Sequence, residues 1–128
     1  RWLEFRRVLF RSTTGTYLSR IREYEAINYK PELGDLKKKL MAMTETYEKL
    51  VAMVLDTKDN EYLDFQARRL VEAGAHCVMG YLLLQDANVD ETYRRSAEVY
   101  INYGQAEVNK INGYISSFDM EDLGYYKQ

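Results

Sequence analysis

The sequence is poor in residues that usually mark a disulfide framework or a chemical site, with one cysteine, one histidine and one proline among 128 residues. A lone cysteine, Cys77, forms no internal disulfide and fits a reducing compartment. No apolar run approaches the roughly 20 residues that a membrane-spanning helix needs. A chain of this length can form an apolar core without disulfides or structural metals. We therefore expect one cytoplasmic domain with no membrane span.

Charge is nearly balanced, with 18 basic and 20 acidic residues. The balance is uneven along the chain, because residues 1–12 hold four arginines and a single acid, Glu4. Residues 13–128 therefore carry 14 basic and 19 acidic groups. A surface that binds nucleic acid needs a basic patch or stripe. The acidic body predicts no nucleic-acid partner.

Residues 1–12, RWLEFRRVLFRS, differ in composition from the rest and include no initiating methionine. An arginine-rich amphipathic segment can act in targeting or in surface binding. However, Leu3 to Ser12 more closely resembles the conceptual translation of a sequencing-library adapter. We therefore interpret residues 1–12 as non-native and residues 13–128 as a single helical-bundle domain, the C-terminal fragment of a longer protein.

Apolar residues recur along the body at spacings of three and four, without the alternation of a half-buried strand. This periodicity predicts an all-α domain with helices over about residues 16–28, 31–54, 61–84 and 89–118. Asp59 or Asn60 is expected to cap the third helix, and Asn88 with Glu91 resembles a capping box for the fourth. Short breaks indicate an up-down antiparallel four-helix bundle. Asp119 is expected to cap a short C-terminal helical turn.

The third segment is the most apolar and should be the most buried helix. Gly74 and Gly80 lie within it, where each glycine would cost about 1 kcal/mol relative to alanine if it were exposed. We therefore expect both glycines to allow a close approach of neighbouring helices. On the same segment, His76 is expected to be a packed or interface side chain, and Cys77 is expected to be a small apolar residue of the core stripe.

Helical bundles can hold dinuclear metal sites, but these need two Glu-x-x-His pairs. Glu72 and His76 are four residues apart, and there is no second histidine. Cys77 has no evident base, and apolar surroundings make a thiol inert by raising its pKa. Glycine-rich phosphate loops do not occur in the sequence. We accordingly assign no catalytic, cofactor-binding or metal-binding residue.

The twelve tyrosines are the compositional oddity. Four of them fall on apolar stripes and are expected to be core or interface residues with a hydrogen-bonded hydroxyl: Tyr47, Tyr81, Tyr93 and Tyr100. The basic run from Lys37 to Lys39 fits a solvated helix face. The pairs Arg68-Arg69 and Arg94-Arg95 fit either ion pairs or contact with an acidic face of a partner.

Three stretches between Asn60 and Lys127 carry a family resemblance: EYLDFQARRLVEAGAHCVMGYLLLQDA, YRRSAEVYINYGQAEVNKINGYI and FDMEDLGYYK. They resemble the C-terminal helical extension of bacterial acyl-CoA dehydrogenases of the Bacteroidetes type. Residues 16–56 are compatible with the earlier helices of that extension, but their pattern is generic. The resemblance implies a parent flavoenzyme that uses FAD to oxidise acyl-CoA thioesters to 2-enoyl-CoA. It places the catalytic glutamate, the FAD site and the thioester cleft upstream of this chain.

Three hypotheses follow for the chain itself. The first is an accessory domain that packs on the dehydrogenase core or on a second subunit of a homo-oligomer. The second is a free-standing helical adaptor whose tyrosine-rich stripe binds a partner protein. Nucleic-acid binding ranks third because of the acidic body.

We predict that deletion of residues 1–12 leaves the stability of the domain unchanged, because these residues are interpreted as non-native. Thermal unfolding of the full and shortened chains measures this. A loss of more than about 2 kcal/mol, the scale of one well-buried side chain, would identify the segment as a packed element.

Overall fold

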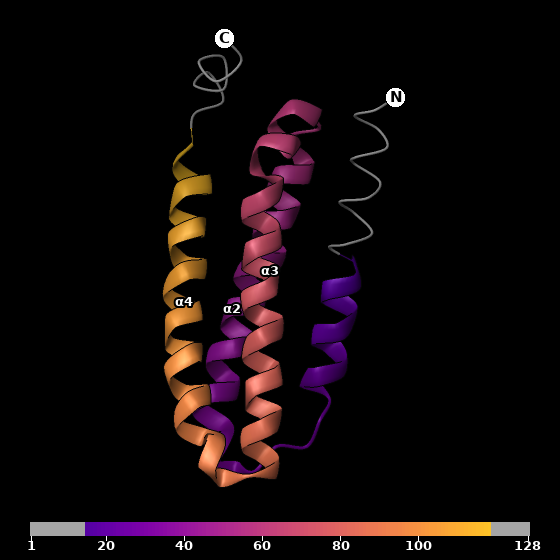
Figure 1. Cartoon of the computed structure of the whole chain (residues 1–128). Helices are drawn as coiled ribbons and strands as arrows, with labels where there is room; N and C mark the ends of the chain where they lie inside the picture. Colours follow the sequence, from indigo (N-terminus) through magenta and orange to yellow (C-terminus); the bar gives the residue numbers. More distant parts are fainter. Residues whose placement is uncertain (1–14, 119–128) are drawn as a thin grey trace.

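The computed structural model describes residues 15–118, and these fold into four helices (Figure 1). An N-terminal helix covers residues 15–25 and is followed by α2 (Gly34–Asp56), α3 (Asn60–Val89) and α4 (Arg94–Ser117). Two short 3₁₀ helices, η1 (Pro31–Leu33) and η2 (Glu91–Tyr93), lead into α2 and α4. The described residues contain no strand. The predicted all-α class is confirmed.

Successive helices run in opposite directions, which confirms the up-down bundle (Figure 1). The helices α2, α3 and α4 each contact the other two. The N-terminal helix lies on the opposite side of α3 from α4 (Figure 1). The three long helices supply most of the core, and the shorter N-terminal helix adds the fully buried Ile21 to it.

Local signals in the sequence account for the start of two helices. Pro31 occupies the first turn of η1, where a missing N–H costs nothing. Asp59 caps α3, because its Oδ1 accepts hydrogen bonds from the backbone N–H groups of Glu61 and Tyr62 at 2.9 and 3.1 Å. Lys58 precedes this cap with a φ of 54°, which turns the chain sharply between α2 and α3. Of the two residues predicted as the cap, Asp59 fills that role, and Asn60 is the first residue of α3.

The predicted capping box at Asn88 is wrong. Asn88 lies within α3, and its side chain accepts from the backbone N–H of Lys30 at 2.9 Å and donates to the carbonyl of Asn28 at 3.2 Å. The cap is Asp90, whose carboxylate accepts from the backbone N–H of Thr92 at 3.0 Å. Asn88 is thus used to hold a distant loop against the end of α3. The predicted C-terminal turn at Asp119 lies outside the described residues.

Two glycines of α3 mark its closest contacts with other helices. A Cβ atom added to Gly80 would overlap the side chain of Leu40 on α2 and touch Ile101 on α4 at 3.7 Å. A Cβ atom added to Gly74 would come within 2.6 Å of Tyr17 and 2.9 Å of Tyr47. The expectation that both glycines allow close helix approach is confirmed.

We predict that Gly80→Leu lowers the free energy of unfolding by about 1 to 3 kcal/mol or more, because Leu40 and Ile101 already fill the space. Gly113→Leu on α4 is the matched control, since nothing lies within 4 Å of a Cβ atom at that position. The control should stabilise the protein by several tenths of a kcal/mol through helix propensity. Urea denaturation compares the two. Equal effects would contradict the packing described.

Candidate functional site between α3 and α4

A cluster of aromatic side chains lies where α3 meets α4. Nδ1 of His76 and the hydroxyl of Tyr100 are 3.1 Å apart and share a hydrogen bond. The ring of Tyr103 meets His76 edge-on, with centroids 5.8 Å apart, and lies 6.1 Å from the ring of Tyr100. His76 and Tyr100 are half-buried, whereas Tyr103 is 54% exposed. The cluster therefore presents one anchored pair and one open ring to solvent.

Two exposed apolar side chains are close to this cluster along the helices, because Met79 follows His76 by three residues on α3 and Val99 directly precedes Tyr100 on α4. Val99 is 57% exposed and Met79 is 46% exposed. An open hollow of about 470 Å³ is lined by Arg95, Ser96, Val99, Tyr100 and Tyr103. We call the surface formed by His76, Met79, Val99, Tyr100 and Tyr103 the α3/α4 patch. Exposed apolar surface of this kind marks contact sites.

Three of these five residues, Met79, Val99 and Tyr103, were not predicted as site residues from the sequence. Each lies off the buried stripe of its helix, so the periodicity that finds the core passes over it. The available signal was the occurrence of large apolar residues at positions expected to be polar.

Glu72 and His76, which the sequence did not support as metal ligands, have separate partners in the structure. The carboxylate of Glu72 is exposed and bonds the guanidinium of Arg68 at 3.3 Å, while His76 bonds Tyr100. Among residues 15–118 no three His, Cys, Asp or Glu side chains are grouped to hold a metal ion. Over the same residues no helix is long and apolar enough to cross a membrane.

The four tyrosines expected at core or interface positions differ in environment. Tyr47 and Tyr81 are fully buried, and Tyr100 is half-buried. A core position is wrong for Tyr93, which is 52% exposed. The reason is that α4 begins at Arg94, after η2, so Tyr93 falls outside the helical stripe on which its spacing placed it.

Polar groups inside the bundle connect three helices. The hydroxyl of Tyr81 donates to Glu25 of the N-terminal helix at 3.1 Å, and Thr44 of α2 interacts with both Tyr81 and Cys77 of α3. Burial raises the pKa of the Cys77 thiol to about 12, although the hydrogen bond with Thr44 opposes this. Burial, together with the charge of Glu25, also raises the pKa of Tyr81. Both groups stay protonated at neutral pH, so this region holds the fold and offers no nucleophile.

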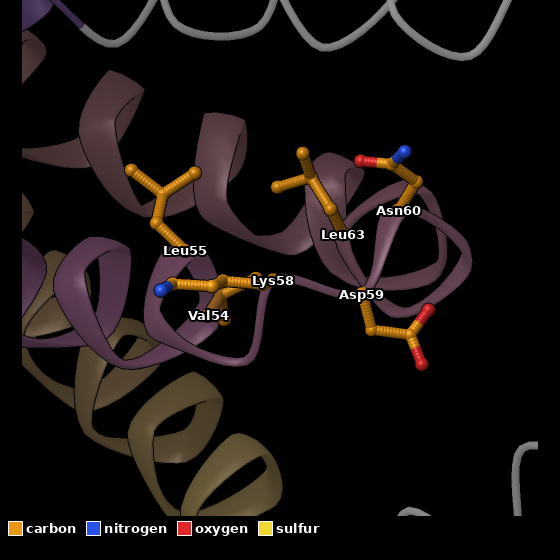
Figure 2. Close-up of a pocket in the computed structure, with 6 residues that line it drawn as sticks. All are labelled: Val54, Leu55, Lys58, Asp59, Asn60 and Leu63. Carbon is orange, nitrogen blue, oxygen red and sulfur yellow. The ribbon is translucent and has the colours of Figure 1, made fainter.

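The turn between α2 and α3 forms a second hollow, shown in Figure 2. Its walls are Val54, Leu55, Lys58, Asp59, Asn60 and Leu63. The hollow has no room for a water molecule. It is a packed helix turn, not a ligand site.

The chain is similar in sequence and structure to one family of enzymes. The family model described as "Acyl-CoA dehydrogenase C terminal" matches residues 13–123. A solved structure of an acyl-CoA dehydrogenase family protein from Porphyromonas gingivalis is 53% identical, with a TM-score of 0.82. The match covers 86% of this chain and 97% of that chain. No curated protein matches the chain significantly.

The chain therefore belongs to the acyl-CoA dehydrogenase C-terminal family. It is a C-terminal domain of that enzyme family, as the resemblance of residues 60–127 implied. The match over residues 13–123 also includes the helices before Asn60, where the sequence pattern alone was generic.

We predict that Cys77→Ala flattens the dependence of stability on alkaline pH. The thiol of the unfolded chain ionises around its ordinary pKa of 9.0, whereas the native thiol keeps its proton up to about pH 12. Stability is therefore lost as the pH rises above 9, by about 1.4 kcal/mol per pH unit. Between pH 8 and pH 10 the variant should lose about 1 kcal/mol less than the wild type in urea denaturation. Parallel losses would contradict the burial of the thiol.

Proposed function

We propose that this domain is an accessory docking module of an FAD-dependent acyl-CoA dehydrogenase. It packs on the dehydrogenase core or on a second subunit through the α3/α4 patch. The observation that carries the proposal is the exposure of Val99, Tyr103 and Met79 beside the anchored pair His76 and Tyr100. Aromatic residues and methionine are enriched at the centres of protein interfaces.

We place no FAD or acyl-CoA site on the described residues. Both ligands carry phosphates, which need several converging donors or a helix N-terminus with a glycine-rich loop. The hollow of the α3/α4 patch has a single cationic side chain on its wall, Arg95. This supports the proposal that cofactor and substrate bind to the dehydrogenase core and that this chain contributes binding surface.

A patch held in a fixed shape suits docking better than a flexible surface does. His76 neighbours the buried Cys77 on α3, and Tyr100 neighbours the buried Ile101 on α4. The bond between His76 and Tyr100 holds the two helices together at the level of the patch. Less side-chain freedom is then lost when a partner covers these residues.

Binding of this chain to the parent dehydrogenase truncated before Thr13 tests the proposal, with isothermal calorimetry as the readout. Val99→Glu places a carboxylate in the α3/α4 patch and should weaken binding by about tenfold or more. The reason is that the new carboxylate would lose water on binding without gaining an ion pair. Ala52→Glu, at an exposed position of α2, makes the same charge change elsewhere and should leave the dissociation constant within about twofold.

Two outcomes contradict the docking proposal. Equal weakening by Val99→Glu and Ala52→Glu would show that the interface lies elsewhere on the domain. Absence of binding to the truncated enzyme, together with a monomeric state of the chain, would favour the free-standing adaptor instead.

We predict that the isolated chain retains no FAD, because the sequence has no glycine-rich phosphate loop and the hollow of the α3/α4 patch has a single cation on its wall. Purified protein is incubated with FAD, desalted and examined by visible absorbance. Colourless protein is expected. Stoichiometric flavin absorbance at neutral pH would show that the domain holds a cofactor site.

A further inference from the structure

Arg69 of α3 is held between aromatic rings at the other end of the contact between α3 and α4. Its guanidinium carbon lies 4.2 Å from the ring centroid of Tyr114 on α4 and 5.3 Å from that of Phe65 on α3. Phe118, at the end of α4, packs against both rings, with centroid distances of 5.2 Å to Phe65 and 5.8 Å to Tyr114. The guanidinium is therefore fixed in a half-buried aromatic setting.

Within residues 15–118, hydrogen bonds use only one end of the Arg69 guanidinium. Nη1 donates to the carbonyl oxygen of Phe65 at 3.3 Å and to Oε1 of the buried Gln66 at 3.4 Å. The donors on Nε and Nη2 form the other edge, and this is the edge that binds a carboxylate through two parallel hydrogen bonds. Arg69 thus has a free fork of fixed orientation.

The charge of Arg69 is not matched by an acid of the described chain. No Asp or Glu among residues 15–118 lies within 4 Å of its nitrogens, although its neighbours are paired. Arg68 pairs with Glu72 at 3.3 Å, and Lys110, one turn before Tyr114, pairs with Glu107 at 4.0 Å. The Arg69 guanidinium is partly desolvated between aromatic rings and keeps the donors on Nε and Nη2 for a further partner. Such a group is suited to bind a single anion from outside the domain.

We propose that Arg69 binds a carboxylate side chain of the dehydrogenase core on which this domain docks. The inference rests on the proposed function and names the chemistry of the partner at one point. Arg69 is seven residues from His76 on α3, about 10 Å along the helix, so one interface of ordinary size reaches both. The docking surface then combines the α3/α4 patch with one charged anchor.

A carboxylate suits this site better than a phosphate does. A phosphate monoester carries close to two negative charges and is usually held by several donors, whereas Arg68 and Lys110 are already paired with Glu72 and Glu107. Residues 13–128 are also acidic as a whole, with 19 acidic and 14 basic groups. A nucleotide or polyphosphate would be repelled by that charge, whereas a single Asp or Glu of a partner protein matches one guanidinium fork.

The test measures binding of Arg69 variants to the parent dehydrogenase truncated before Thr13, by calorimetry at several salt concentrations. Arg69→Met keeps an extended side chain against Tyr114 but removes the charge, and it should raise the dissociation constant about 30-fold or more. Arg69→Lys keeps the charge without the fork and should fall between Arg69→Met and the wild type. Binding of Arg69→Met should also depend less on salt than wild-type binding does.

Arg68→Met is the matched control, because Arg68 is the neighbouring residue but is 90% exposed and already paired with Glu72. It should leave the dissociation constant within about twofold. Thermal unfolding of each free variant separates loss of folding from loss of binding. Wild-type affinity in a folded Arg69→Met variant would overturn the inference while leaving the docking proposal intact. Failure of the wild-type chain to bind would overturn both.

Discussion

The close contact of α3 with both α2 and α4 is the constraint on which the rest of the structure depends. Gly80 admits Leu40 from one side and Ile101 from the other, so α3 lies deep in the bundle over most of its length. A side chain at this point would push the helices apart. His76 and Arg69 flank the buried stripe of α3. Because α3 is packed deep in the bundle, both residues lie at the edge of the contact between α3 and α4.

The proposed docking surface is therefore an extension of the core. His76 neighbours Cys77 and Arg69 neighbours Leu70, and both of these neighbours are fully buried. Partners on α4, Tyr100 for His76 and Tyr114 for Arg69, complete two anchored contacts along one seam. Interior packing of this density holds side chains in defined rotamers, so the same helices supply both stability and a preformed surface.

Helical periodicity was sufficient to predict the class of fold, the buried stripes and the role of Gly80, because these depend on spacing within a single segment. The cap at Asp59 was predictable for the same reason. Asn88 was not, since its side chain is used by the backbone of Asn28 and Lys30, which lie about 60 residues away in the chain. The surface residues Val99 and Tyr103 were also missed, because an exposed apolar residue departs from the pattern by which a core is recognised.

The central claim, that the contact between α3 and α4 is covered in the parent enzyme, is tested most directly by cysteine labelling. The native Cys77 is fully buried, with its pKa raised to about 12, so it contributes little reaction with maleimide at neutral pH. A cysteine placed at Val99 should react readily in the isolated chain and at least about tenfold more slowly in the full-length dehydrogenase. The control is a cysteine placed at the exposed Glu45 of α2, which should react at the same rate in the two proteins. Equal reactivity of the cysteine at position 99 in the two proteins would contradict the account.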